Sequence, residues 1–214
     1  MTYAQTSRMA TSDFFARLGI FTFKGFLDPQ FCANYLTEAN LVTATPALVL
    51  PKSGDIILEA QVCQSQRRTE QLKISTLTES FIHKRLLAIK PTLESYFGLP
   101  LSGFQKPLFY RYKKGSFFGA HQDSSDRPDA PNFIKERRVS IILFLNSKAV
   151  EPSPLTYCGG NLTFYKLIDD PRWETYGFPI ESEAGMLVAF RSDIWHEVKP
   201  VTDGERYTIV SWFF

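Results

Sequence analysis

The chain has 214 residues, of which 44% are hydrophobic and 21% are charged, a composition within the range of one compact globular domain. Its 24 Lys and Arg residues against 22 Asp and Glu residues give a formal charge of +2, without long runs of like charge, so a nucleic-acid-binding surface is not expected. No apolar run approaches the roughly 20 residues of a membrane-spanning helix, and three scattered cysteines without a signal peptide favour the cytoplasm.

The beginning of the chain predicts a short strand followed by a helix. Residues 1–12 are polar, small and without periodicity, so we expect a flexible lead-in. Residues 21–26 alternate apolar and other side chains, as a strand does. Asp28 and Pro29 then resemble an N-cap followed by proline at the first helical position, which predicts a helix over residues 29–40.

A second helix is predicted from Thr76 to Gly98. Glu79 stands three residues after Thr76, the spacing of a capping box, and apolar residues then recur at helical spacing. Pro91 should bend or interrupt this helix because proline has no backbone N–H. Gly98 marks the expected end.

After Pro107 the chain predicts a sheet, because segments rich in β-branched and aromatic residues alternate with clusters of Gly, Pro, Asn or Asp. The predicted strands are residues 108–112, 139–146, 161–165, 185–190 and 206–214. The predicted helices come first and most of the strands follow, so helices and strands do not alternate along the chain. This order argues against a doubly wound nucleotide-binding fold and for an α+β, mainly β architecture. No internal repeat or linker is visible, so one domain over residues 1–214 is expected.

Two of the three histidines carry the candidate chemistry. His121 and Asp123 stand at positions i and i+2, so on an extended segment both side chains point to one side and can bind one metal ion. His196 follows a predicted strand much later in the chain. Two imidazoles and one carboxylate form the facial triad that holds Fe(II) and leaves open positions. Arg206, ten residues beyond His196, offers a fixed guanidinium suited to a dicarboxylate co-substrate.

The series His121-x-Asp123, His196, Arg206 resembles the Fe(II)/2-oxoglutarate-dependent dioxygenases, and within them the prolyl 4-hydroxylase-like branch. The resemblance implies a double-stranded β-helix (jelly roll, cupin-like) core with N-terminal supporting helices, and residues 108–214 as the catalytic core. It also implies Fe(II), 2-oxoglutarate as co-substrate and dioxygen, with ascorbate as a further candidate cofactor. His121, Asp123 and His196 would bind the metal, and Arg206 would bind 2-oxoglutarate.

The sequence around these residues agrees with the resemblance. Tyr112 matches the tyrosine of the strand that leads to the first ligand, and Trp212 stands where prolyl hydroxylases often carry a tryptophan. Residues 159–164 look like the family's Gly-Gly strand, and residues 185–190 look like the strand ahead of the distal histidine. Both aromatic residues are candidates for binding the cofactors, and both could instead fill the core.

Some positions depart from the family's commonest forms. Collagen-type prolyl hydroxylases usually have lysine in place of Arg206, and often Gly-Gly-Glu-Thr in place of residues 159–162. Phe144 stands where oxygen-sensing relatives have a tyrosine that helps bind 2-oxoglutarate. Tyr112 and Thr208 are the candidates for the missing hydroxyl group. These departures leave the substrate-facing side of the pocket free to differ from a proline-specific one.

The resemblance implies hydroxylation of an unactivated C–H bond with release of succinate and CO₂. A free amino acid, a peptidyl residue and a natural-product intermediate all stay open as the substrate, and ring closure or desaturation stays open beside hydroxylation. The alternative is a noncatalytic β-sandwich binding module descended from this fold. We expect a small-molecule or peptide partner and neither nucleic acid nor membrane; the sequence does not determine the oligomeric state.

Two segments lie near the expected site. Residues 67–69 resemble a basic segment near the active-site mouth of prolyl hydroxylases, but a solvated loop is the favoured interpretation. Residues 124–133, rich in Asp and Pro, predict a long loop just past the first two ligands. Loops in such a position typically shape substrate access.

Overall fold

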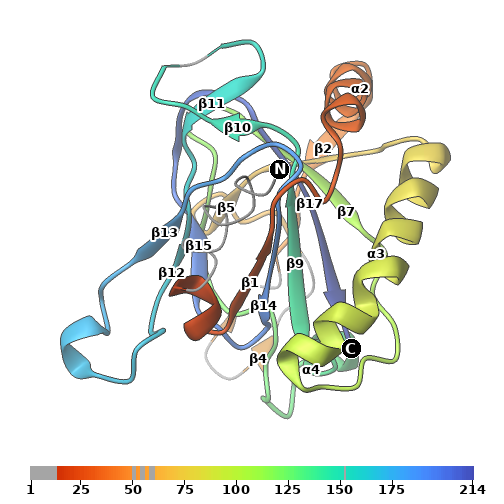
Figure 1. The fold of residues 1–214 in the computed structure, drawn as a ribbon. Coiled ribbons are helices and arrows are strands. Elements are labelled where there is room, and N and C mark those ends of the chain that lie inside the picture. Colours follow the sequence, from red (N-terminus) through yellow and green to blue (C-terminus); the bar gives the residue numbers. More distant parts are fainter. Residues whose placement is uncertain (1–13, 50–51, 54–55, 58–60, 152) are drawn as a thin grey trace, which may run out of the picture.

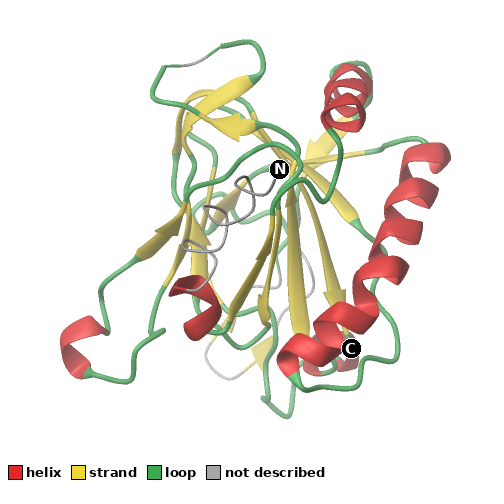
Figure 2. Ribbon diagram, viewed as in Figure 1, coloured by secondary structure: helices red, strands yellow, loops and turns green. Residues whose placement is uncertain are grey.

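Two antiparallel sheets face each other, and helices α2 and α3 pack on the outer face of the larger sheet (Figure 1 and Figure 2). The computed structural model describes residues 14–49, 52–53, 56–57, 61–151 and 153–214. The flexible lead-in expected over residues 1–12 lies outside these ranges. Among the described helices, none combines the length and the apolar character that crossing a membrane requires.

The larger sheet has seven strands in the order β1-β14-β9-β17-β7-β6-β2. In this order their bounds are Ile20–Phe23, Leu187–Arg191, Val139–Phe144, Arg206–Phe213, Leu108–Tyr112, Glu70–Leu72 and Ala44–Pro46. Four of the five strands predicted in the second half are the neighbouring strands β14, β9, β17 and β7 of this sheet. The N-terminal half of the chain contributes the edges.

The smaller sheet has five strands in the order β13-β12-β15-β8-β5. In this order their bounds are Phe178–Ile180, Leu162–Phe164, His196–Val198, Phe117–His121 and Arg67–Arg68. The other described elements are β10 (Ser147–Lys148), β11 (Thr156–Gly159), β16 (Val201–Gly204), β3 (Lys52–Ser53), β4 (Ile56–Ile57), α4 (Asn132–Lys135) and η1 (Pro171–Trp173). Only β12 of the smaller sheet follows from the sequence pattern, because charged or small residues interrupt the apolar pattern of β5, β8 and β15.

Successive side chains of β9 point to opposite faces of the larger sheet and so belong to two apolar layers. Ile141 and Leu143 point outward into the layer beneath the helices, whereas Ile142 and Phe144 point inward between the sheets. The helices bury Tyr35, Leu36 and Ala39 of α2 and Ile82, Leu86 and Leu93 of α3 in the outer layer. The predicted mainly β fold class with N-terminal supporting helices is confirmed.

The start of the chain follows the prediction with one difference. Strand β1 ends at Phe23, because residues 24–26 turn away, with a positive φ of 67° at Gly25. Helix α2 (Pro29–Ala39) begins as predicted: the carboxylate of Asp28 accepts a hydrogen bond from the backbone N–H of Phe31 at 2.8 Å.

Helix α3 (Thr76–Phe97) differs from its prediction at two points. The N-cap is Ser75 instead of Thr76, since the Ser75 hydroxyl accepts from the backbone N–H of Thr78 at 3.3 Å. Pro91 lies inside the helix without interrupting it. Gly98 ends the helix in the left-handed conformation, as predicted.

Candidate metal centre and its cavity

The two histidines and the aspartate singled out by their spacing meet at the ends of β8 and β15. His121 ends β8 and His196 begins β15, and the two residues are partners in this antiparallel pair. Asp123 reaches both imidazoles: its Oδ1 lies 3.5 Å from Nε2 of His121 and its Oδ2 lies 3.5 Å from Nε2 of His196. Ligand atoms of the three residues, called the triad below, lie within 4.8 Å of one another, close enough to share one metal ion.

Hydrogen bonds determine which nitrogen of each imidazole faces the metal position. Nδ1 of His121 lies 2.8 Å from the carbonyl oxygen of Gly119, and Nδ1 of His196 lies 2.9 Å from that of Ile194. Because a carbonyl oxygen only accepts, Nδ1 carries the hydrogen in both rings and donates it. Nε2 of each ring therefore presents its lone pair beside Asp123, as a metal ligand must.

The protonation states of Asp123 and His196 suit a divalent cation. Burial alone would raise the pKa of Asp123, but the neighbouring imidazoles of His196 and His121 and the charge of Arg137 hold this pKa well below its usual range. Burial lowers the pKa of His196 to about 4, and the nearby His121 adds to the shift. A carboxylate and a neutral imidazole are the forms in which these side chains bind metals.

Two serines and an arginine hold Asp123 in place. Ser140 of β9 donates from Oγ to Oδ2 of Asp123 at 2.7 Å, and its Oγ also lies 2.9 Å from Oγ of Ser192. The backbone N–H of Asp123 donates to the carbonyl oxygen of Ser192 at 2.9 Å. Nη1 of Arg137 donates to the carbonyl oxygen of Asp123 at 3.1 Å. The carboxylate is thereby oriented by the larger sheet while the histidines come from the smaller one.

Ser140→Ala should weaken metal binding without removing a ligand. The variant loses the hydrogen bond that orients Asp123, and partners of this kind are typically worth about 10–100-fold in metal affinity. Ser211→Ala is the matched control, because Ser211 is also buried in the larger sheet but donates to the carbonyl oxygen of Gln105. Anaerobic Fe(II) titration of both variants measures the difference. If Ser140→Ala bound Fe(II) as tightly as Ser211→Ala, Ser140 would not position the triad.

Arg206 lies between the two sheets and is only 1% exposed. It is the first residue of β17, opposite Tyr112, and its guanidinium carbon lies 4.9 Å from the ring centre of Tyr112 and 5.1 Å from that of Phe144. Nη1 donates to Oγ1 of Thr208 at 3.5 Å, whereas Nε and Nη2 have no hydrogen-bond partner within the described part of the chain. A buried guanidinium with unused donors is suited to an incoming carboxylate.

Strand β17 links Arg206 with the triad. Alternate residues of a strand face the same side, so Arg206, Thr208 and Trp212 share one face. Trp212 pairs with Ser140 and so lies at the triad end of that face. Gly160 leaves space at the other end, since a Cβ there would lie 3.1 Å from Cδ of Arg206. This close approach explains one glycine of the Gly-Gly segment.

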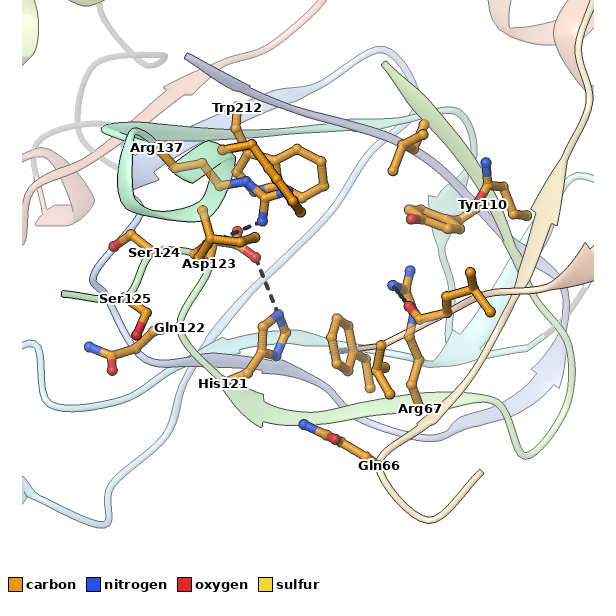
Figure 3. A pocket seen from close by; sticks show the side chains of 17 residues that line it. Gln66, Arg67, Tyr110, His121, Gln122, Asp123, Ser124, Ser125, Arg137 and Trp212 are labelled. Carbon is orange, nitrogen blue, oxygen red and sulfur yellow. Dashed lines mark hydrogen bonds and ion pairs between the residues drawn. The ribbon is translucent and has the colours of Figure 1, made fainter. Parts of the chain in front are cut away.

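A cavity of about 370 Å³ opens beside the triad (Figure 3). Side chains from both sheets line it, including Arg67, Tyr110, His121, Asp123, Arg137 and Trp212. The guanidinium of Arg137 lies 3.6 Å from the ring centre of Trp212, and its Nε and Nη2 donate to Oε1 of Gln105 at 3.0 and 2.9 Å. Arg137 and Trp212 therefore form one fixed wall, on the side of Asp123 (Figure 3).

The structure brings the seven predicted site residues together in two groups. His121, Asp123 and Trp212 line the cavity and His196 completes the triad beside it, while Arg206, Thr208 and Tyr112 lie farther along β17 and β7. The roles assigned to them stay predictions. The interpretation of residues 67–69 as a solvated loop is wrong for Arg67, which is 7% exposed because β5 pairs with β8.

The donor set fits the cofactors that the resemblance implies. Two Nε2 atoms and a carboxylate on one side of a metal position are the ligands of a facial triad for Fe(II) with room for dioxygen. The unused donors of Arg206 fit a carboxylate of 2-oxoglutarate. Ascorbate stays a prediction.

Comparison with known proteins adds an independent line of evidence. The profile of the 2OG-Fe(II) oxygenase superfamily matches residues 107–214. A PKHD-type hydroxylase of Shewanella sp. (strain ANA-3) is 34% identical to this chain over 156 residues, which cover 71% of this chain and 62% of that protein. The chain thus spans about three fifths of the length of this curated relative.

Solved structures share the fold. A prolyl-4-hydroxylase of Pseudomonas putida has a TM-score of 0.62 at 23% identity, covering 95% of this chain and 96% of that one. A second structure is a prolyl hydroxylase of Trichoplax adhaerens in complex with a hypoxia inducible factor oxygen degradation domain peptide fragment. It has a TM-score of 0.61 at 21% identity, covering 98% of this chain and 93% of that one. The predicted double-stranded β-helix core is confirmed.

Proposed function

The chain belongs to the 2OG-Fe(II) oxygenase superfamily, and from this membership and its site we propose that it is a 2-oxoglutarate-dependent, prolyl hydroxylase-like enzyme. The observation that carries the proposal is the combination of two features in one fold. The triad presents three converging ligand atoms. Arg206 is buried on the face of the larger sheet that is turned towards the triad, and its Nε and Nη2 have no hydrogen-bond partner among the described residues.

The triad residues His121, Asp123 and His196 would hold Fe(II). Bound iron, with 2-oxoglutarate and dioxygen, supplies the oxidising power to hydroxylate an unactivated C–H bond, with release of succinate and CO₂. The protein's own contribution is to keep both Nε2 lone pairs and the Asp123 carboxylate directed at one point. Ser140 and the carbonyl groups behind the imidazoles provide that orientation.

Arg206 would bind the carboxylate of 2-oxoglutarate that lies away from the metal. Its guanidinium can donate two parallel hydrogen bonds, and few solvent molecules compete at 1% exposure. Thr208 already accepts from Nη1 and so restrains the side chain, and the ring of Tyr112 packs beside the guanidinium. Trp212 would act at the other end, as part of the cavity wall beside the triad.

The cavity beside the triad would receive the substrate. At about 370 Å³ it suits a small molecule or one side chain. We therefore propose an amino acid, a peptidyl residue or a natural-product intermediate as the substrate class. A noncatalytic module that does not bind 2-oxoglutarate would leave the burial of Arg206 without a purpose, because an unpaired buried charge destabilises a protein.

We also propose that the chain acts as one domain. The profile match begins at residue 107, but β1 joins the larger sheet at β14 and β5 joins the smaller sheet at β8. Residues well before the predicted core, 108–214, therefore complete both sheets and contribute Arg67 to the cavity.

Succinate production tests the proposed function. The protein with Fe(II), 2-oxoglutarate and air should form succinate and CO₂ in equal amounts, and a substrate from the proposed classes should accelerate both. The His196→Ala variant, prepared in parallel, measures the background from free iron. Succinate formation no faster than this background, with and without candidate substrates, would contradict the proposal.

A further inference from the structure

A second buried guanidinium, that of Arg67, lines the cavity. The residue is 7% exposed, and its buried Nε has no hydrogen-bond partner in the described ranges. Nη1 donates a long hydrogen bond, of 3.4 Å, to the carbonyl oxygen of Leu48, and the hydroxyls of Tyr110 and Tyr112 are the other hydrogen-bonding neighbours of the guanidinium. The guanidinium carbon lies 4.1 Å from the ring centre of Tyr110 and 4.4 Å from that of Phe118. Aromatic rings thus flank the guanidinium, while part of its hydrogen-bonding edge is unused.

No acidic side chain in the described part of the chain balances the charge of Arg67. Within the described residues no Asp or Glu forms an ion pair with it, and the polar side chains facing it are the uncharged hydroxyls of Tyr110 and Tyr112. By contrast, Arg111 pairs with Glu70 at 2.7 Å. A guanidinium keeps its charge under all ordinary conditions, so its burial without a counter-charge is costly. Arg67 and Arg206 thus share a buried guanidinium with an unpartnered Nε in the described part of the chain. This shared feature indicates a second carboxylate-binding position.

Arg137, the other arginine of the cavity, does not offer such a position. Its Nε and Nη2 donate to Gln105 and its Nη1 donates to the carbonyl oxygen of Asp123. Its flat face lies on Trp212. Arg137 is therefore a positioning residue, whereas Arg67 keeps an Nε without a hydrogen-bond partner among the described residues.

Arg67 stands at a useful distance from the triad. The ring of Phe118 lies between the guanidinium and His121, stacking on that imidazole with 3.7 Å between ring centres. In Figure 3, Arg67 and Tyr110 lie across the cavity from Asp123. A small molecule held at Arg67 would thus extend towards the metal position.

We propose that Arg67 binds a carboxylate of the substrate, and that the substrate is a small molecule with a free carboxylate, such as an amino acid, instead of an internal residue of a peptide. The inference rests on the proposed function and deepens it. 2-Oxoglutarate does not account for Arg67, because Arg206 serves one of its two carboxylates and the other belongs at the metal. A single guanidinium among apolar side chains balances a single negative charge.

The test compares matched probes and matched variants. The common L-amino acids are supplied as free acids, as carboxamides, and as the central residue of tripeptides blocked at both ends. Arg67→Gln removes the charge, Arg67→Lys keeps it, and Arg68→Gln is the control on the neighbouring, exposed residue. Two readouts are used: the increase in succinate formation, and calorimetric binding to protein loaded with Zn(II) and 2-oxoglutarate, which cannot turn over.

We expect at least one free acid to bind and to accelerate succinate formation, and its carboxamide and blocked tripeptide to be at least about tenfold weaker. Arg67→Gln should lose about tenfold or more in affinity for the acid and most of the preference over the carboxamide, Arg67→Lys should recover part of both, and Arg68→Gln should match the parent. The dissociation constant of 2-oxoglutarate should stay close to that of the parent in all three.

Three results would overturn the inference: neutral probes that act as well as the acids, no binding of any free acid to the loaded protein, or an effect of Arg67→Gln on 2-oxoglutarate instead of on the acid. The probe comparison needs no variant, so it holds even if Arg67→Gln fails to fold. A protein that forms succinate but prefers blocked tripeptides would refute this inference while leaving the proposed function intact. A protein that forms no succinate would refute the proposed function.

Discussion

Alanine in place of His121, Asp123 or His196 should abolish both Fe(II) binding at the triad and the formation of succinate from 2-oxoglutarate. Each substitution removes one of three converging ligand atoms and leaves two that cannot hold the ion in its required geometry. The loss of Fe(II) affinity should exceed the roughly 10–100-fold loss expected when only an orienting partner such as Ser140 is removed. Anaerobic Fe(II) titration and succinate assays on the three variants measure both effects.

His83 provides the control for these substitutions. It is the remaining histidine of the chain and lies on α3, where its ring contacts Phe104. His83→Ala should therefore bind Fe(II) like the parent protein. If two of the three triad variants kept the parent's affinity and turnover, the assignment of the ligands would be wrong.

Arg206→Ala should raise the concentration of 2-oxoglutarate needed for half-maximal rate more than tenfold while leaving Fe(II) affinity nearly unchanged. Removing one partner of a buried charge pair costs on the order of 2–5 kcal/mol. The metal is unaffected because the ligands of the triad lie on other strands, β8 and β15, and the segment after β8. Steady-state titration of 2-oxoglutarate and a separate Fe(II) titration distinguish the two effects.

Two milder variants check the geometry of this interaction. Arg206→Lys should recover part of the lost affinity, since lysine keeps the charge but not the paired donors. Tyr112→Phe should have a smaller effect, because one hydroxyl is worth about 0.5–1.5 kcal/mol. An unchanged 2-oxoglutarate constant in Arg206→Ala would place the co-substrate's carboxylate elsewhere, with Arg67 as the next buried guanidinium to examine.

The parts of the fold that could be predicted from sequence are those with a local signal. Strand β7 appears within its predicted bounds, and α2 starts where Asp28 and Pro29 predict it. Strand β5, with only Arg67 and Arg68, has no periodicity to detect. It exists because β8 supplies a hydrogen-bonding partner distant in sequence, and such pairings are not visible in a short charged segment.

The same limit applies to the site. The triad and Arg206 could be singled out as candidates because residue type and spacing together match a known chemistry. Ser140 and Arg137 carry no comparable signal, since a serine in an apolar strand and an arginine in a charged segment are common. Their roles depend on β9 and the segment before it lying beside Asp123, which only the three-dimensional arrangement establishes.

Anaerobic titration of the protein with Fe(II) and 2-oxoglutarate, followed by visible absorption, tests most directly whether the triad and Arg206 form one binding site. We expect a weak charge-transfer band that requires both additions and saturates at about one Fe(II) per chain. The band should be absent from His196→Ala, and in Arg206→Ala it should need a much higher concentration of 2-oxoglutarate. No band at saturating concentrations of both, or a band whose dependence on 2-oxoglutarate is the same in Arg206→Ala as in the parent, would contradict the account.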